Sequence, residues 1–372
     1  MNPFWSPVVG QLAPYTPGEQ PRIAGLIKLN TNELPYGPAP GVVAAIRAAA
    51  LDGLNLYPDP QSSALCDALA RYHGVSRDCV FVGNGSDEVL AHTFAALLKH
   101  EEPLLFPDVT YSFYPTYCRL FGITHEVVPV NSALCVDVGD YARRAGAIVM
   151  PNPNAPTGRA IGLAEVERLL TMHPNAPVVM DEAYVDFGAQ TAIPLIARHP
   201  NLLIVRTMSK SRGLAGLRVG YALGQPHLID ALRRVKDSFN SYPLDRMAQA
   251  GAIASLEDEG YFQHCRQTII TSRENLTQGL EALGFHVLPS RANFVFAQHP
   301  DHDAALLALA LRETKILVRH FSTPRVEAFL RITVGDAQQV KMLLGALEVI
   351  LAGLRPRPSK SARPGSSLPP VT

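Results

Sequence analysis

Short apolar runs alternate with longer amphipathic stretches between residues 79 and 206, and this alternation constrains the fold more than any other feature of the sequence. Buried strands are predicted at 79–82, 104–106, 125–129, 147–150, 178–181 and 202–206, with helices over 87–99, 112–121 and 163–172. Strands that alternate with helices form a largely parallel sheet with helices on both faces. The sequence therefore predicts an α/β protein with a doubly wound sheet.

The pattern changes after about residue 225, where helices over 226–238 and 245–283, the second interrupted near Gly260, precede shorter strands and helices typical of an α+β unit. One core rarely exceeds about 250–300 residues, so a chain of 372 residues predicts two domains. We expect an N-terminal arm at 1–40, a large domain at 41–240, a small C-terminal domain at 241–354 and a disordered tail at 355–372.

The bulk composition is that of a globular protein, with 47% hydrophobic and 18% charged residues. Lys+Arg and Asp+Glu are both 33, a balance that gives no indication of nucleic-acid or membrane partners. The five cysteines have wide spacings and no C-x-x-C pattern, so we interpret them as reduced packing residues. Together with an N-terminus that lacks the features of a signal peptide, they predict a cytoplasmic protein.

The stretch 207–221, T-M-S-K-S-R-G-L-A-G-L-R-V-G-Y, places Lys210 among small residues just after a predicted strand. A lysine at a strand end is most often a solvated surface charge. In doubly wound sheets, however, ligands bind at the carboxyl ends of the strands. Ser209 and Arg218 suit a phosphate, and Lys210 suits an imine.

Other predicted strand ends also carry polar residues. The turn from Gly83 to Glu88 opens a helix and can bind an anion, although it matches neither a dinucleotide fingerprint nor a P-loop. Asp181 ends a buried strand, where a carboxylate is costly unless a cation pairs with it. A rigid turn at 151–158 presents amide side chains. These features together match the chemical demands of pyridoxal phosphate: a phosphate cradle, an acid for a pyridinium, donors for a ring oxygen and an amine for an aldehyde.

The chain resembles the fold-type I pyridoxal-phosphate aminotransferases of class II, and within them the enzymes that act on histidinol phosphate. The resemblance spans residues 12 to about 352. It is carried by motifs in family order at 12–15, 29–33, 57–58, 83–88, 110–111, 156–158, 181–184, 209–221, 292–294 and 330–335. It implies pyridoxal 5'-phosphate as cofactor, a homodimer as the active unit, and transamination between L-histidinol phosphate and 2-oxoglutarate in histidine biosynthesis.

The resemblance also implies roles for individual residues. Lys210 would bond the cofactor and move the substrate proton, Asp181 would keep the pyridine nitrogen protonated, and Tyr184 would donate to the ring oxygen. Tyr111 would stack on the ring. The phosphate would be held by the residues Gly85, Ser86, Asp87, Ser209 and Arg218, with Tyr57 reaching it from the neighbouring subunit.

One position departs from the family pattern. Relatives carry Asn immediately before Pro-Thr-Gly, where this chain has Ala155, which cannot donate to the ring oxygen. Either Asn154 takes over through a shifted turn, which is the reading we favour, or Tyr184 acts with less help.

Substrate contacts are expected from four further residues. Arg331 would bind a carboxylate, Arg319 is a candidate contact for a substrate phosphate, and Tyr15 and Asn32 belong to the arm that would cover the site. No metal is expected: the His299-Pro300-Asp301-His302 pair is interpreted as surface loop.

Three alternative functions stay open at this point. One is transamination of aromatic amino acids, and a second is decarboxylation of phosphorylated threonine on the same scaffold. The third is a cofactor-binding regulator without catalysis, but residues 1–40 are too short and too rich in proline for a DNA-binding helix-turn-helix.

Overall fold

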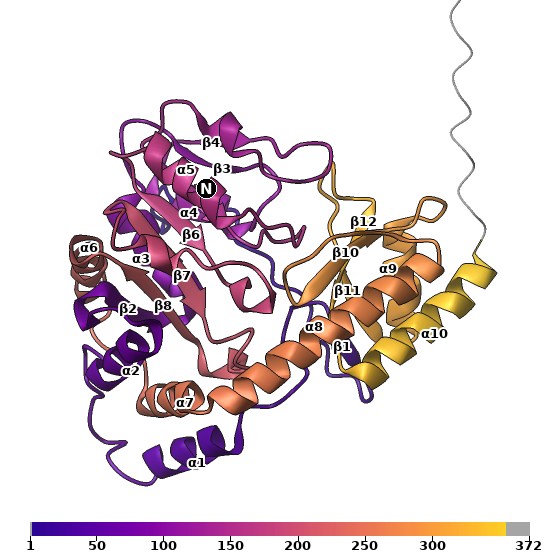
Figure 1. Ribbon diagram of the computed structural model, residues 1–372, viewed down its shortest axis with the longest axis horizontal. Coiled ribbons are helices and arrows are strands. Elements are labelled where there is room, and N and C mark those ends of the chain that lie inside the picture. Colours follow the sequence, from indigo (N-terminus) through magenta and orange to yellow (C-terminus); the bar gives the residue numbers. More distant parts are fainter. Residues whose placement is uncertain (1, 355–372) are drawn as a thin grey trace, which may run out of the picture.

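The computed structural model describes residues 2–354, so the tail predicted as disordered, 355–372, lies outside the described residues. The described part of the chain contains a seven-stranded sheet, the large sheet, and a five-stranded sheet, the small sheet. Figure 1 shows the helix-covered large sheet on one side of the molecule and the small sheet with its helices on the other.

The large sheet has the strand order β2-β8-β7-β6-β5-β3-β4. Its strands are β2 (Val80–Asn84), β3 (Leu104–Pro107), β4 (His125–Val128), β5 (Ala147–Pro151), β6 (Val178–Asp181), β7 (Leu202–Thr207) and β8 (Val219–Gly224). All adjacent pairs from β7 to β4 are parallel, which confirms the predicted α/β fold. Strand β8 runs antiparallel to both β2 and β7. It was not predicted, because its two glycines interrupt the apolar pattern by which a short strand is recognised.

Two layers of helices cover the large sheet, and the alternation of side chains along each strand explains why. In β6, Val178 and Met180 face one core while Val179 faces the other. The first core includes residues of α1 (Pro40–Ala49), α2 (Ser63–His73), α5 (Leu163–Met172) and α7 (Arg246–Glu257). The second includes residues of α3 (Gly85–Leu97), α4 (Phe113–Phe121) and α6 (Pro226–Asp237).

The small sheet has the order β1-β11-β12-β10-β9. Its strands are β1 (Ile27–Leu29), β9 (His286–Leu288), β10 (Phe294–Gln298), β11 (Ile316–His320) and β12 (Phe329–Thr333), and it packs on α8 (Glu259–Ala282), α9 (Ala304–Glu313) and α10 (Ala337–Gly353). Strand β1 lies within the predicted arm, yet it pairs in parallel with β11. The arm therefore contributes a strand to the small sheet, which the sequence pattern of Pro and Asn did not suggest.

Helix α8 connects the two parts of the molecule. It begins after α7, where the Asp258 side chain caps it by accepting from the Tyr261 N–H, and this break lies close to the predicted interruption at Gly260. From there α8 runs along the molecule to the small sheet (Figure 1). Helix α7 packs on α1 and α2, beside the large sheet, although it falls within the predicted small domain. The domain boundaries stay a prediction.

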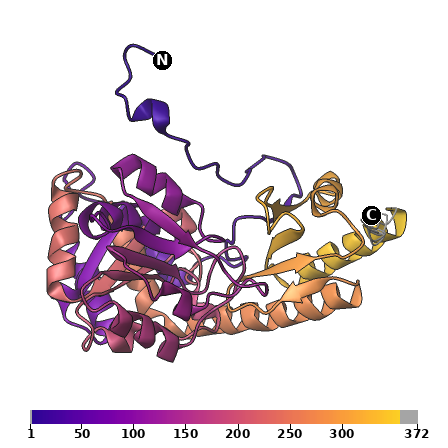
Figure 2. The ribbon, with the colours of Figure 1, turned by 90° about the horizontal axis from the view of Figure 1, so that it is seen from above.

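Figure 2 shows that the first residues of the chain stand clear of the helices and sheets, and that the segment then returns toward the junction of the two parts. Strand β1 follows this segment directly. The arm thus reaches the junction between the large sheet and the small sheet. Among the described residues, no helix combines the length and the apolar character that a membrane crossing requires.

Candidate active site

One cavity of about 170 Å³ lies where the carboxyl ends of β5, β6 and β7 face the arm and the small sheet. Its lining includes most of the residues predicted from the sequence: Tyr15, Asn32, Ser86, Asp87, Tyr111, Asp181, Tyr184, Ser209, Lys210, Arg218, Arg319 and Arg331. Residues from 15 to 331 in the sequence thus meet in one place. Three predicted residues, Gly85, Asn154 and Tyr57, do not line the cavity.

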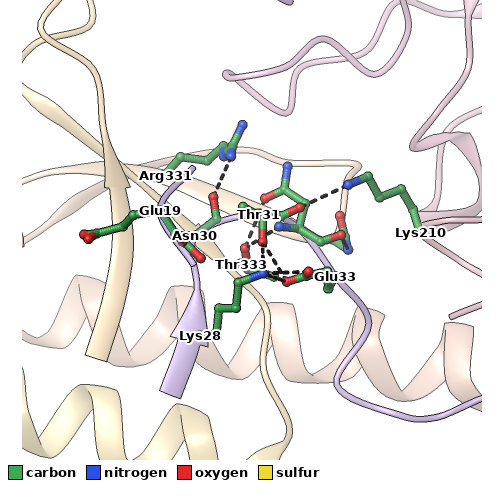
Figure 3. Close-up of polar contacts among 10 residues, drawn as sticks. Glu19, Lys28, Asn30, Thr31, Glu33, Lys210, Arg331 and Thr333 are labelled. Carbon is green, nitrogen blue, oxygen red and sulfur yellow. Dashed lines mark hydrogen bonds and ion pairs between the residues drawn. The ribbon is translucent and has the colours of Figure 1, made fainter. Parts of the chain in front are cut away.

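Lys210 follows β7 by three residues and points across the cavity toward the arm. Its Nζ donates to the backbone carbonyl of Thr31 at 3.0 Å, as Figure 3 shows, and lies 5.8 Å from the centre of the Tyr184 ring. The next residue, Ser211, donates to Asp186 at 2.5 Å, and Asp186 also pairs with the buried Arg206. The Ser211 side chain beside Lys210 is therefore fixed, while the hydrogen bond of the Lys210 amine goes to a neutral backbone carbonyl.

Asp181 is the last residue of β6 and is almost fully buried. Burial raises the pKa of its carboxyl group to about 6, although two hydrogen bonds favour the charged form. Tyr114 donates to Oδ2 at 2.7 Å, and the Ala183 N–H donates to Oδ1 at 3.2 Å. A cation placed against this carboxylate would offset much of the cost of its burial.

The start of α3 and the loop before β8 form a cradle suited to an anion. Because β8 runs antiparallel to β2, Arg218 at its start lies beside the end of β2, pairing with Asp87 at 3.2 Å and approaching Ser209 Oγ at 3.5 Å. Gly85 has φ of +76°, and a Cβ there would collide with the Arg218 guanidinium. The positive φ favours glycine at 85, and a larger side chain there would displace the Arg218 guanidinium from the cradle. The N–H groups of the first turn of α3 add the positive end of the helix dipole.

Tyr111 lies on one wall of the cavity. Its hydroxyl donates to Asp87 Oδ1 at 3.0 Å, and its ring packs edge-on against Tyr114 with centroids 5.8 Å apart. The side chain of Asp87 thus accepts from Tyr111 and pairs with Arg218, so this carboxylate ties the two predicted cofactor contacts to each other. The predicted stacking role of Tyr111 is compatible with this placement and stays a prediction.

The turn at 151–158 differs from the arrangement that the sequence favoured. Asn154 is buried, and its amide donates to the Val109 carbonyl at 2.8 Å, away from the cavity lining. Ala155 lines the cavity instead. The backbone of Asn154 is also fixed, because its N–H donates to the Arg159 carbonyl. The amide of Asn154 is therefore engaged elsewhere, and the structure gives the expected shifted turn no support.

The arm and the small sheet supply the opposite wall. Tyr15 stacks on Phe113 with ring centroids 4.6 Å apart. Arg331, on β12, donates to the Asn30 carbonyl at 2.9 Å, and Arg319, on β11, donates to the Thr16 carbonyl at 3.5 Å. Burial lowers the pKa of Arg331, and its Nε has no hydrogen-bond partner among residues 2–354. Figure 3 shows Arg331 and Lys210 reaching the same arm segment from opposite sides.

Tyr57 lies outside the cavity, on an exposed loop between α1 and α2. Its side chain is 79% exposed and stacks on Tyr242 with ring centroids 4.5 Å apart. Within one chain it therefore contacts none of the predicted cofactor residues.

Three contributors to the site were missed in the sequence. Tyr114 holds Asp181, and the carbonyls of Asn30 and Thr31 hold Arg331 and Lys210. A tyrosine within an apolar helical stretch was the available signal for Tyr114, because a buried hydroxyl needs a partner. Backbone carbonyls carry no signal of this kind, since every residue has one.

Comparison with known proteins agrees with this geometry. Residues 24–347 match the family model described as aminotransferase class I and II. The chain is 62% identical over 351 residues to the histidinol-phosphate aminotransferase of Gluconacetobacter diazotrophicus, covering 94% of this chain and 99% of that protein. It is 60% identical over 348 residues to histidinol-phosphate aminotransferase 2 of Thiobacillus denitrificans, covering 93% and 98%. The chain belongs to the aminotransferase class I and II family.

A solved structure supports the same assignment of fold. The histidinol-phosphate aminotransferase of Sinorhizobium meliloti, determined in complex with pyridoxal-5'-phosphate, aligns with a TM-score of 0.83 at 27% identity. The alignment covers 95% of this chain and 99% of that one. The predicted fold-type I architecture, with a large α/β part and a smaller C-terminal part, is thereby confirmed.

Proposed function

We propose that this chain catalyses the pyridoxal-phosphate-dependent transfer of an amino group between L-histidinol phosphate and 2-oxoglutarate, a step of histidine biosynthesis. The observation that carries the proposal is the convergence, in one cavity, of a lysine amine bound to a carbonyl, a buried carboxylate, and two arginines that donate to carbonyls and lie over aromatic rings. Relatives about 60% identical over nearly the whole chain carry the corresponding name.

The residues of the cavity fit pyridoxal 5'-phosphate. The buried Asp181 suits a cationic ring nitrogen, the Gly85–Arg218 cradle suits a phosphate, and Lys210 suits an aldehyde. When bound, the cofactor supplies an aldehyde for the amine and a cationic ring that withdraws electrons from the reacting carbon of the substrate.

Lys210 acts in two ways in this proposal. Its amine would hold the cofactor through the cofactor's aldehyde, and when it is not bonded to the cofactor the same amine would accept and return the proton of the reacting substrate carbon. The Thr31 carbonyl, 3.0 Å from Lys210 Nζ, is a neutral hydrogen-bond acceptor for the amine when it is not bonded to the cofactor. A neutral acceptor orients the amine without pairing its charge with a carboxylate.

Asp181 acts through its charge. A cation against the carboxylate favours its ionised form, and Tyr114 and the Ala183 N–H hold its two oxygens in place. The same carboxylate keeps the ring nitrogen protonated. Its burial excludes water, which strengthens this pairing.

Substrate recognition rests on Arg319 and Arg331, with Tyr15 covering them. Histidinol phosphate carries a phosphate and glutamate carries carboxylates, and guanidinium groups bind both kinds of anion through paired N–H donors. Because both arginines donate to carbonyls, an incoming anion replaces a neutral partner and breaks no ion pair.

The active unit in this proposal is a homodimer. Tyr57 stacks on Tyr242 at the surface, and large apolar side chains near the two tyrosines in the sequence are exposed as well. The exposed apolar cluster is the set Leu51, Leu54, Leu56, Tyr57, Phe239 and Tyr242. Exposed clusters of this kind mark interaction surfaces. Docking of a second copy on this cluster would let Tyr57 reach the phosphate site of its neighbour. Sedimentation of the purified protein tests this: a monomer at the working concentration of the assay would contradict it.

We also infer a cytoplasmic location. All five cysteines are free in the structure, and three of them are buried. Buried thiols that form no disulfide suit a reducing compartment.

A side-by-side measurement of kcat/KM tests the substrate. Histidinol phosphate is expected to exceed phenylalanine and phosphothreonine, each with 2-oxoglutarate as acceptor. A preference for phenylalanine would favour an aromatic aminotransferase, and release of carbon dioxide from phosphothreonine would favour a decarboxylase. Cofactor binding without turnover of any of the three would favour the regulator.

A further inference from the structure

We propose that Asn32 is a positioning residue that makes the Tyr184 hydroxyl a hydrogen-bond donor toward the cofactor, in the place that Ala155 leaves without a donor. This inference deepens the proposed function and rests on it. It assigns Asn32 a role other than the substrate contact expected from the sequence.

The direction of one hydrogen bond carries the argument. Asn32 Nδ2 donates to the Tyr184 hydroxyl oxygen at 3.0 Å. Because that oxygen accepts from the amide, its own proton must point elsewhere. Within residues 2–354 the structure gives this hydroxyl no other hydrogen-bond partner, and Tyr184 lines the cavity. The proton is therefore available to a ring oxygen bound in the cavity.

Hydrogen bonds on both sides of Asn32 fix the orientation of its side-chain amide. Its Oδ1 accepts from Thr333 Oγ1 at 3.1 Å, which fixes Nδ2 as the end that faces Tyr184. Its backbone N–H donates to the same Thr333 oxygen, and its carbonyl accepts from Asn293 Nδ2, each at 3.0 Å. Asn32 is 1% exposed and has φ of +58°, a conformation that asparagine tolerates better than most residues.

The apolar residues around the Tyr184 ring supply no other side-chain hydrogen-bond donor for the ring oxygen of the cofactor. Its ring packs against a small apolar cluster of Ala155, Ala292 and Phe294, with the Phe294 ring edge-on at 5.1 Å. None of these side chains can donate, and Asn154 donates to Val109 instead. The arm thus supplies the amide that the turn at 151–158 does not supply.

The test uses the cofactor-loaded enzyme and reads the pH at which the absorbance of the bound cofactor changes. A donor to the ring oxygen stabilises its negative charge, so losing the donor raises this transition pH. Asn32→Gly, which tolerates the positive φ and adds no charge, is expected to raise it by about one pH unit and to weaken cofactor binding several-fold. Asn201→Gly is the matched control and leaves the transition in place, because it makes the same change at a partly buried asparagine whose amide donates to the carbonyls of His173 and Ala176, outside the cavity lining.

A double-mutant comparison separates positioning from structure. In a Tyr184→Phe background, Asn32→Gly is expected to cause no further shift, since its effect passes through the hydroxyl. A shift that persists in that background, or no shift when Tyr184 is present, would overturn the inference. Asn32→Ser, too short to reach Tyr184, gives a second route to the same comparison. Absence of any cofactor band in the unaltered enzyme would instead overturn the proposed function, and this inference with it.

Discussion

The charged groups on the two walls of the cavity have different kinds of hydrogen-bond and ion-pair partners. On the wall formed by the large sheet, charged groups are bound to one another or to buried hydroxyls, as in the Arg218–Asp87 pair and the Tyr114–Asp181 bond. On the wall formed by the arm and the small sheet, Arg331 and Arg319 donate to backbone carbonyls, and Lys210 donates to the arm across the cavity.

This difference separates a permanent ligand from transient ones. Internal pairs give the sheet wall a fixed geometry before anything binds, which suits a resident cofactor. Carbonyls hold a cation in place without cancelling its charge, so the arm wall keeps its attraction for anions that arrive and leave. The predictions below test whether the two walls respond to substitution as this division requires.

Removal of the Lys210 amine is expected to have the largest effect. Lys210→Ala should lower kcat by about 10⁴-fold or more, because both the covalent contact and the proton transfer are lost. Steady-state assay with saturating cofactor measures this. Lys99→Ala, at an exposed lysine that donates to the Phe121 carbonyl, is the control and should leave kcat unchanged. Loss of less than about tenfold in the Lys210 variant would contradict the assignment.

Neutralising Asp181 should stabilise the cofactor-free protein while impairing catalysis. The folded pKa of about 6 lies above the ordinary value of 3.8 for an aspartate, so the folded state binds the proton more tightly than the unfolded state does. Stability from this group is full below pH 4 and falls as pH rises through 6, by about 3 kcal/mol in all. Asp181→Asn removes this loss.

Urea unfolding of the cofactor-free variant should therefore show a gain of about 3 kcal/mol at pH 8 and roughly half of that at pH 5. The same variant should bind the cofactor more weakly than the unaltered protein does. A variant that is less stable at pH 8 than at pH 5, relative to the unaltered protein, would show that Asp181 is a structural carboxylate and not one reserved for a cation.

Substitution on the arm wall should change substrate binding more than cofactor binding. Arg331→Lys keeps the charge but loses the paired N–H geometry, so KM for the anionic substrates should rise by about 10- to 100-fold while the cofactor dissociation constant stays the same. Arg218→Lys provides the matched comparison on the sheet wall. It should raise the cofactor dissociation constant and leave KM for the anionic substrates the same. Equal effects of both variants on cofactor affinity would remove the distinction between the walls.

The Lys28–Glu33 ion pair within the arm should contribute the least to stability. Its side chains are 24% and 39% exposed, and such pairs contribute about 0–1 kcal/mol. The pKa of Glu33 is lowered in spite of burial, because Lys28 and Thr31 donate to it, so its contribution is present at neutral pH and lost in acid. Glu33→Gln should lower the free energy of unfolding by less than about 1 kcal/mol at pH 7. A change of several kcal/mol would mean that the arm is anchored chiefly by this pair.

Sequence reasoning predicted the sheet wall better than the arm wall, for a physical reason. Strand ends are visible as polar residues after apolar runs, and Asp181 and Lys210 were located in this way. Strand β1 has three residues and gains its partner only through the distant β11, so no local pattern marks it. The contacts of the arm are made largely through carbonyls, which a sequence does not distinguish.

The turn at 151–158 shows that hydrogen bonds between distant segments limit what the sequence can predict. Ala155 was noticed as a departure, but Asn154 was expected to compensate because it is adjacent in sequence. The residue that we propose in this place, Asn32, is remote in sequence and is brought to Tyr184 by tertiary contacts, among them the bond that Asn32 accepts from Thr333. Hydrogen bonds between distant segments depend on tertiary packing, and a single sequence does not reveal them.

Borohydride reduction of the enzyme loaded with pyridoxal phosphate, followed by peptide mapping, tests the central claim most directly. A stable adduct on the peptide that contains Lys210, absent from the Lys210→Ala variant, is the predicted result. An adduct on another lysine, or a protein that stays colourless with the cofactor and takes up none, would contradict the account.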